Sequence, residues 1–98
     1  MAPIYKVWMH KPSDAYLQLS EQEQNAVLAK LGDLAKQCGG KPILQCFSAW
    51  SNQEWPIFGL EEWPNVEALQ RYHSLIYETG LARYGEDWSL LGTKWPPE

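Results

Sequence analysis

The sequence predicts an α+β fold in which four strands and two helices follow one another in the order βαββαβ. The chain has 98 residues, which is the size of a single domain. Two of its segments repeat apolar residues at steps of three and four, as amphipathic helices do. Four others are rich in β-branched and aromatic residues between turn-forming clusters, which is typical of strands. We therefore expect one domain that spans residues 1–98.

The first strand and the first helix are expected in the first 40 residues. Residues 4–10 favour a strand, and a loop is expected to follow up to Leu19. Ser20 and Glu23 form a capping box, in which each side chain binds the backbone N–H of the other residue. The helix face then carries Val27, Leu28, Leu31, Leu34, Ala35 and Cys38. Gly39-Gly40 ends the helix, because the position after a helix favours a positive φ.

The two middle strands are predicted to form a hairpin. They occupy residues 42–50 and 55–63, and the four polar residues 51–54 form the loop between them. Pro56 lies early in the second of these strands, where a residue without an N–H is tolerated only at a strand start or edge.

The second helix and the last strand complete the order of elements. Asn65 is the expected N-cap of the helix, and Gly80 is expected to end it. Its apolar face carries Val66, Leu69, His73 and Ile76. A short turn at residues 85–87 leads to the fourth strand, residues 88–95.

This order predicts the ferredoxin-like arrangement, a four-stranded antiparallel sheet with both helices on one face. The other face of the sheet then needs a cover, because aromatic residues are expected on both faces. Six of the 98 residues are tryptophans, more than a small monomer covers easily. We therefore expect an obligate homodimer in which two sheets pack against each other.

Charge and cysteine content argue against several classes of partner. The formal charge is -4, with 12 acidic residues against 8 scattered basic ones, which argues against a nucleic-acid partner. The sequence has neither a polybasic patch nor an apolar run of about 20 residues, so no membrane partner is expected. Cys38 and Cys46 form no disulfide framework, and the first residues do not resemble a signal peptide. We therefore expect a soluble cytoplasmic protein.

Two stretches carry a resemblance to a known group of proteins. In residues 59–69 (GLEEWPNVEAL) a strand ends in an aromatic residue and a helix opens with Glu-Ala-Leu, and Lys11-Pro12 separates the first strand from the capped helix. With the order of elements, they resemble the dimeric α/β-barrel superfamily, which includes antibiotic-biosynthesis-monooxygenase-like and stress-responsive barrel proteins. The resemblance covers nearly the whole chain. It implies a homodimer that packs through its sheets into an α/β barrel, with a pocket between each sheet and its helices.

Fold does not settle function in this superfamily, whose members carry out cofactor-free oxidation of aromatic polyketides, haem degradation and lactone isomerisation. The haem-degrading members combine an Asn on the first strand with a Trp and a His on the second helix. Here residues 4–10 contain no Asn and the second helix contains no Trp, so only His73 matches. Haem degradation is therefore rejected, and we expect no cofactor.

The topology is expected to gather aromatic residues at the two ends of the sheet. One end holds His10, Trp50, Trp55, Tyr77 and Trp88, and the other holds Tyr5, Trp63 and Trp95. An aromatic wall with a titratable histidine suits a small apolar or aromatic ligand, and an aromatic minicore or a dimer rim would look the same. The candidate ligand-binding residues are Tyr5, Trp50, Trp55, Tyr77 and Trp88.

The two histidines are the candidate catalytic residues. His73 faces the sheet, where burial would keep its imidazole neutral and able to act as a base, with His10 as the second candidate. The alternative is a core histidine that binds a backbone carbonyl or a tyrosine. No pair of His or Cys residues has metal-ligand spacing, so no metal site is expected. Glu61-Glu62 offers one candidate inward carboxylate, since neighbours in a strand point to opposite faces, and the favoured alternative is a solvated strand end. Lys6 is expected to pair with an acid across the dimer.

Three functions remain open at this point. The first is a cofactor-free monooxygenase-like enzyme, in which a histidine deprotonates an electron-rich aromatic substrate that then reacts with dioxygen. The second is a non-catalytic module that binds a small apolar molecule, and the third is a purely structural dimer. A His and a Tyr in one closed cavity would favour the enzyme, so whether the chain is an enzyme stays open.

Overall fold

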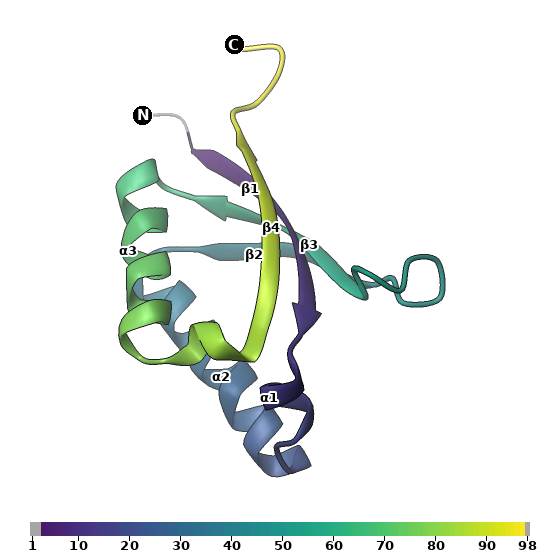
Figure 1. The fold of residues 1–98 in the computed structure, drawn as a ribbon. Helices are drawn as coiled ribbons and strands as arrows, with labels where there is room; N and C mark the ends of the chain where they lie inside the picture. The colour runs from purple at the N-terminus through teal and green to yellow at the C-terminus, as the bar shows by residue number, and fades with distance from the viewer. Residues whose placement is uncertain (1–2, 98) are drawn as a thin grey trace.

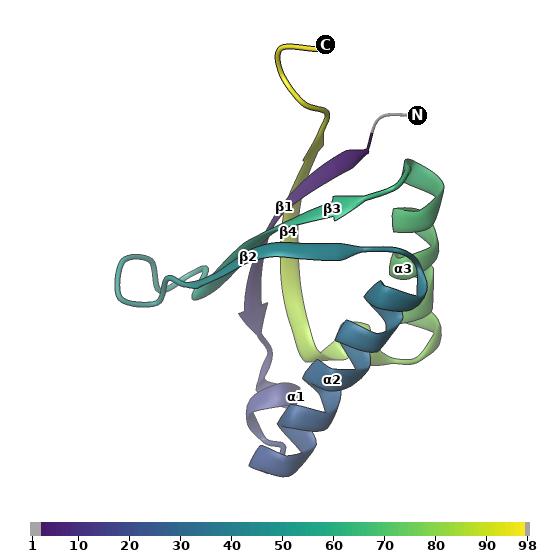
Figure 2. The same cartoon turned by 180° about the vertical axis from the view of Figure 1, so that it is seen from behind.

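The computed structural model describes residues 3–97 and contains one four-stranded antiparallel sheet in the order β2-β3-β1-β4. The two long helices, α2 and α3, lie on one side of this sheet (Figures 1 and 2). The elements are β1 (Ile4–Pro12), α1 (Asp14–Leu17), α2 (Glu21–Gln37), β2 (Lys41–Phe47), β3 (Ile57–Trp63), α3 (Val66–Glu78), the 3-10 helix η1 (Leu81–Tyr84) and β4 (Gly85–Gly92). The predicted ferredoxin-like fold class is therefore confirmed.

The ends of both long helices are fixed by the residues that the sequence indicated. Ser20 and Glu23 form the complete capping box at the start of α2. Asn65 caps α3 by accepting a hydrogen bond from the backbone N–H of Ala68 at 2.8 Å. Gly39 and Gly80 follow the helices with φ of 87° and 77°, a region that only glycine enters without strain.

The predicted hairpin between β2 and β3 is wrong in its bounds. The strands end at Phe47 and resume at Ile57, so the connection is longer than residues 51–54 and projects away from the helices in Figure 1. Ser48 closes the base of this loop, because its hydroxyl donates to the Trp55 carbonyl at 2.6 Å. The Asn52 side chain accepts two backbone N–H groups, from Glu54 and Trp55. These polar side chains offer the backbone partners that compete with a strand ladder.

The bounds of the outer strands also differ from the prediction. The strand predicted at 4–10 continues to Pro12, and the strand predicted at 88–95 begins earlier, at Gly85, because Pro12 pairs with Gly85. The latter strand ends at Gly92. The expected loop up to Leu19 contains the short helix α1, whose N-cap is Ser13.

The core lies between α2, α3, the end of β3 and the start of β1. Trp63 and Leu69 are fully buried there, and the Trp63 ring packs on Tyr72 with 5.0 Å between ring centroids. The predicted apolar faces are only partly buried, since Leu28 of α2 and Val66 of α3 are exposed. Within residues 3–97, none of the helices has the length and apolar character needed to span a membrane.

Strand register assigns each residue of the sheet to one of two faces. Residues directly opposite each other in antiparallel strands share a face, and neighbours along a strand alternate. Lys6 contacts α3, so the face that it shares with its partners Glu61 and Leu91 is the helix side. The opposite side, called the bare face below, carries two apolar rows across all four strands: Leu44, Leu60, Val7 and Leu90, then Cys46, Phe58, Met9 and Trp88.

Candidate functional site

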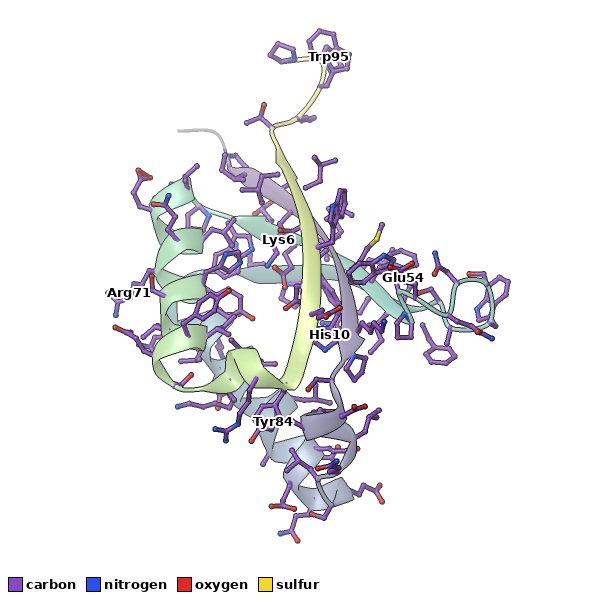
Figure 3. The ribbon with its side chains drawn as sticks, viewed as in Figure 1. Lys6, His10, Glu54, Arg71, Tyr84 and Trp95 are labelled. Carbon is purple, nitrogen blue, oxygen red and sulfur yellow. The ribbon has the colours of Figure 1, made fainter. Side chains whose placement is uncertain are left out.

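A lysine and a histidine from distant parts of the chain meet on the helix side of the sheet. Lys6 Nζ of β1 lies 3.0 Å from His73 Nε2 of α3 (Figure 3 labels Lys6 between β1 and α3). A lysine can only donate to such a contact, so Nε2 of His73 accepts and Nδ1 carries the ring proton. Lys6 is only 8% exposed, which makes this pair, called the Lys6–His73 couple below, part of the interior.

The surroundings of Lys6 are more aromatic than acidic. The nearest carboxylate oxygen, Glu61 Oε1, lies 3.8 Å from Lys6 Nζ and also accepts a hydrogen bond from Trp63 Nε1 at 3.0 Å. The Tyr72 ring lies 5.6 Å from the same nitrogen, within the range of a cation–π contact. The ammonium group therefore has a base, a shared carboxylate and a ring face as neighbours.

Burial shifts the proton affinities of all three groups. Desolvation lowers the pKa of Lys6, although Glu61 opposes this shift by attracting the charged form. Desolvation also lowers the pKa of His73, and the positive charge of Lys6 lowers it further. Burial raises the pKa of Tyr72, with Glu61 as a second cause, so its hydroxyl keeps its proton. His73 is therefore a neutral base at ordinary pH, as the sequence suggested.

A second polar pair ties the edge strand β4 to β1. His10 Nδ1 lies 2.6 Å from Asp87 Oδ1, and the two residues are register partners. The His10 ring lies over Gly85, where an added Cβ would come into contact with the imidazole carbon between its two nitrogens. This glycine is required for the close approach of the ring, so His10 is held in place by packing as well as by its carboxylate.

Trp8 occupies the same side of β1, between Lys6 and His10. Its indole lies across Gly59, where a Cβ would stand 2.6 Å from the ring. Gly59 therefore accepts the indole because it has no side chain. Among the described residues 3–97, the buried Nε1 of Trp8 has no hydrogen-bond partner.

The helices leave part of this side accessible beside the couple. The helix-side residues of β4 are Asp87, Ser89 and Leu91, called the open strip below, and all three are exposed. Leu91 is 46% exposed although it pairs directly with the buried Lys6. A small molecule on the open strip would therefore lie next to Lys6 and His73.

The predicted site residues do not gather in one place. His10 and His73 lie on the helix side, but Tyr5 and Trp88 lie on the bare face with their register partners Glu62 and Met9. Because His10 and Trp88 stand on opposite faces of the sheet, the expected common aromatic wall around His10 is not formed.

The remaining aromatic candidates also lie apart. Trp55 lines a hollow of about 370 Å³ on the bare face, with Val7, Met9, Ser48, Ser51, Asn52 and Phe58. Trp50, in the loop, is 83% exposed. Tyr77 is 75% exposed, one helical turn after His73 and thus on the same side of α3.

Sequence reasoning missed three residues on this side of the sheet. Lys6 contacts His73, the Tyr72 ring lies 5.7 Å from the His73 ring, and Trp8 follows Lys6 on the same face of β1. Lys6 was expected to pair across a dimer, but its side chain turns to the helices. A charged residue in the middle of a strand, with a polar residue on an otherwise apolar helix face, was the signal that could have linked Lys6 to His73. Among residues 3–97, no three His, Cys, Asp or Glu side chains cluster as a metal site would require.

The fold matches two solved structures along nearly the whole chain. One is a protein of unknown function from Rhodopseudomonas palustris, with a TM-score of 0.62 and 15% identity over 98% of this chain and 85% of that one. The other is a mutant of SnoaB, a cofactor-independent oxygenase from Streptomyces nogalater, with a TM-score of 0.59 and 14% identity over 99% of this chain and 97% of that one. No protein-family model and no curated protein sequence matches the chain.

At these identities the likeness establishes the fold and nothing further. The chain shares the fold of this cofactor-independent oxygenase, which agrees with the fold resemblance predicted from residues 59–69 and 11–12.

Proposed function

We propose that the protein is a homodimer that binds a small aromatic molecule on the open strip and takes a proton from its acidic hydroxyl group. The Lys6–His73 couple would receive the proton, and the reaction would follow the pattern of a cofactor-independent oxygenase. The likeness to SnoaB, a cofactor-independent oxygenase, supports this class of reaction because that protein shares the fold.

The bare face supports the dimer. Its two apolar rows cross the whole sheet, and five of their residues are exposed in the single chain: Val7, Leu44, Phe58, Trp88 and Leu90. A contiguous apolar surface of this kind is rare on a monomer. Charged residues flank the rows, with Lys41 opposite Glu62 at one end and Lys11 opposite Glu86 at the other. A second copy of the same sheet would cover the rows and meet complementary charges at the rims.

The observation that carries the proposed chemistry is the 3.0 Å contact between Lys6 Nζ and His73 Nε2. Burial lowers the pKa of His73, so its neutral ring can accept the proton of a phenol or an enol. The ammonium group of Lys6 would stand beside the new oxyanion and stabilise it by charge.

An electron-rich aromatic anion can react with dioxygen without help from a metal or a flavin. In the overall reaction the O–H carbon and one C–H carbon of the ring become the two C=O groups of a quinone. One oxygen atom of dioxygen enters the product, and the other leaves as water with the two hydrogens. Dioxygen supplies the oxidising power, and the protein supplies proton transfer, orientation and charge stabilisation.

A non-catalytic or structural role is the second candidate. The bond from Trp63 Nε1 to Glu61 favours it, because it links Lys6 to the core through one carboxylate. In that case the Lys6–His73 couple is a satisfied polar network whose loss weakens the fold.

Paired binding and melting measurements on His73→Phe decide between these candidates. We expect weaker binding of 2-naphthol, which has an acidic hydroxyl, and unchanged binding of naphthalene, with a melting temperature equal to or above that of the wild type. His10→Phe is the matched control, because His10 lies on the same side but binds Asp87. A melting temperature lowered by several degrees, with unchanged binding of 2-naphthol, would establish the structural role.

A further inference from the structure

We propose that Lys6 forms a reversible imine with small aldehydes or ketones that have an apolar or aromatic body, with His73 as its acid–base partner. This reactivity goes beyond the proposed oxygenase chemistry, because Lys6 acts in it as a nucleophile. It does not require an acidic hydroxyl on the ligand or a reaction with dioxygen.

Lys6 differs from every other lysine of the chain in its environment. The sequence has six lysines, and the other five, Lys11, Lys30, Lys36, Lys41 and Lys94, are exposed. Among the lysines of the described residues, Lys6 is the one that is buried. Burial lowers its pKa, so a larger fraction of its amine is neutral and nucleophilic than for a lysine in water.

The contacts of Lys6 are not those of a tight ion pair. Its short contact, at 3.0 Å, is to a base, and its carboxylate neighbour Glu61 is more distant at 3.8 Å and already accepts from Trp63. A lysine held for structure alone would normally pair closely with a carboxylate, which would keep it charged. Here the partner can take a proton from Lys6 directly.

The reaction balances with the groups that are present. The amine nitrogen attacks the carbonyl carbon, and one N–H proton passes to His73 Nε2 while the carbonyl oxygen becomes a hydroxyl group. That hydroxyl then leaves as water with the proton returned by His73, and the C=N bond forms. The sum is amine plus carbonyl compound to imine plus water, with no oxidant or reductant.

The open strip supplies the access that the reaction needs. Leu91 pairs directly with Lys6 and its exposed side chain offers an apolar surface to the body of the ligand. Ser89 and Asp87 follow along the same edge and are exposed as well. The ligand would therefore reach the amine from the β4 side, without displacing the core around Trp63.

Reductive trapping tests the proposal directly. The protein is treated at neutral pH with benzaldehyde and cyanoborohydride, and the benzyl groups are located by peptide mass spectrometry. We expect Lys6 to be labelled about tenfold or more faster than the mean of the other lysines, since a lower pKa raises the neutral fraction in proportion. His73→Phe should slow the labelling of Lys6 and leave that of Lys41 unchanged.

The opposite results would overturn the proposal. Even labelling of all lysines, or Lys6 as the slowest, would mean that Lys6 is an inaccessible ammonium group. If Lys6 is labelled fast but 2-naphthol does not bind, the imine chemistry stands and the oxygenase proposal fails. Lys6→Met, checked for its fold by circular dichroism, must abolish the fast label. If that variant does not fold, blocking of the wild-type label by prior incubation with excess acetophenone gives the same information, and no blocking contradicts the proposal.

Discussion

The two faces of the sheet are built from alternate residues of the same strands, yet their chemistry is opposite. The bare face has two continuous apolar rows, exposed in the single chain. The helix side carries two sets of polar contacts. Lys6 contacts His73 and Glu61, and His10 contacts Asp87. Apolar surface without a cover favours association, whereas partly buried polar groups with shifted pKa values favour chemistry. The alternation of residues along each strand therefore places an apolar surface on one face of the sheet and polar groups on the other.

The division is sharpest where neighbours in one strand fall on opposite faces. Leu90 is 59% exposed on the bare face, and Leu91 lies beside Lys6 on the helix side. Glu61 turns toward Lys6, and Glu62 accepts a hydrogen bond from Tyr5 on the other face at 3.1 Å. Such pairs give matched variants, which differ in the face and little else.

The largest effect is expected from a charge placed on the bare face. Leu90→Asp should dissociate the proposed dimer at micromolar concentration, because obligate interfaces exclude unpaired charges over an area of roughly 2,000 Å². Leu91→Asp is the control and should remain a dimer, since its side chain lies on the other face. Sedimentation equilibrium measures both masses. Equal masses for the two variants would break the comparison between the faces.

A smaller loss of stability is expected where the helix side is packed most closely. Gly59→Ala should lower the free energy of unfolding by about 1–3 kcal/mol, because the new Cβ meets both the Trp8 ring and the Leu44 carbonyl. Gly32→Ala, in an exposed part of α2 with nothing within 4 Å, should raise it by about 0.5–1 kcal/mol. Urea titrations of both variants measure the difference. An unaffected Gly59→Ala variant would mean that Trp8 does not lie across Gly59.

Replacing the glutamate on the helix side should cost more stability than replacing its neighbour on the bare face. Glu61→Gln removes the charge that Lys6 attracts, and we expect a loss of about 1 kcal/mol. Glu62→Gln keeps an acceptor for the Tyr5 hydroxyl at a half-buried site, so its effect should stay within about 0.5 kcal/mol. The same urea titrations check both values, and a larger effect at Glu62 than at Glu61 would contradict the assignment of the faces.

The smallest effect is a slope of stability with pH. The pKa of His73 in the folded chain is below its ordinary value, so the unfolded chain binds the proton first as the pH falls. The free energy of unfolding should therefore fall below pH about 6.5 and be insensitive to this group above it. Denaturation of the wild type and of His73→Phe at several pH values isolates the contribution of His73 to this pH dependence. If the variant keeps the whole slope, His73 is not the group responsible.

Local features of the fold could be predicted from the sequence. The face of the sheet to which each strand residue points could not. Ser20 and Asn65 cap helices through residues three positions away, so their role is visible in a short window. The alternation in a strand predicts correctly that Glu61 and Glu62 point to opposite sides, but it does not say which side the helices cover. Trp88 was therefore grouped with His10 although it lies on the other face.

Only the His73 side of the Lys6–His73 couple could be predicted from the sequence. The helical spacing of Leu69, His73 and Ile76 placed His73 toward the sheet, and the structure agrees. Its partner lies 67 positions away in the sequence, and nothing within β1 indicates that Lys6 turns inward. The packing of Trp8 on Gly59 depends likewise on strand register, which is set by the whole sheet.

The most direct test of the account is the protonation state of His73, followed by NMR on ring-labelled protein as a function of pH. The account predicts a neutral ring with its proton on Nδ1, and a pKa below the ordinary value of about 6.5. In Lys6→Met the pKa should rise, because the positive charge that lowers it is gone. A His73 that is charged at neutral pH, with a pKa unchanged by Lys6→Met, would contradict the existence of the couple and the chemistry proposed for it.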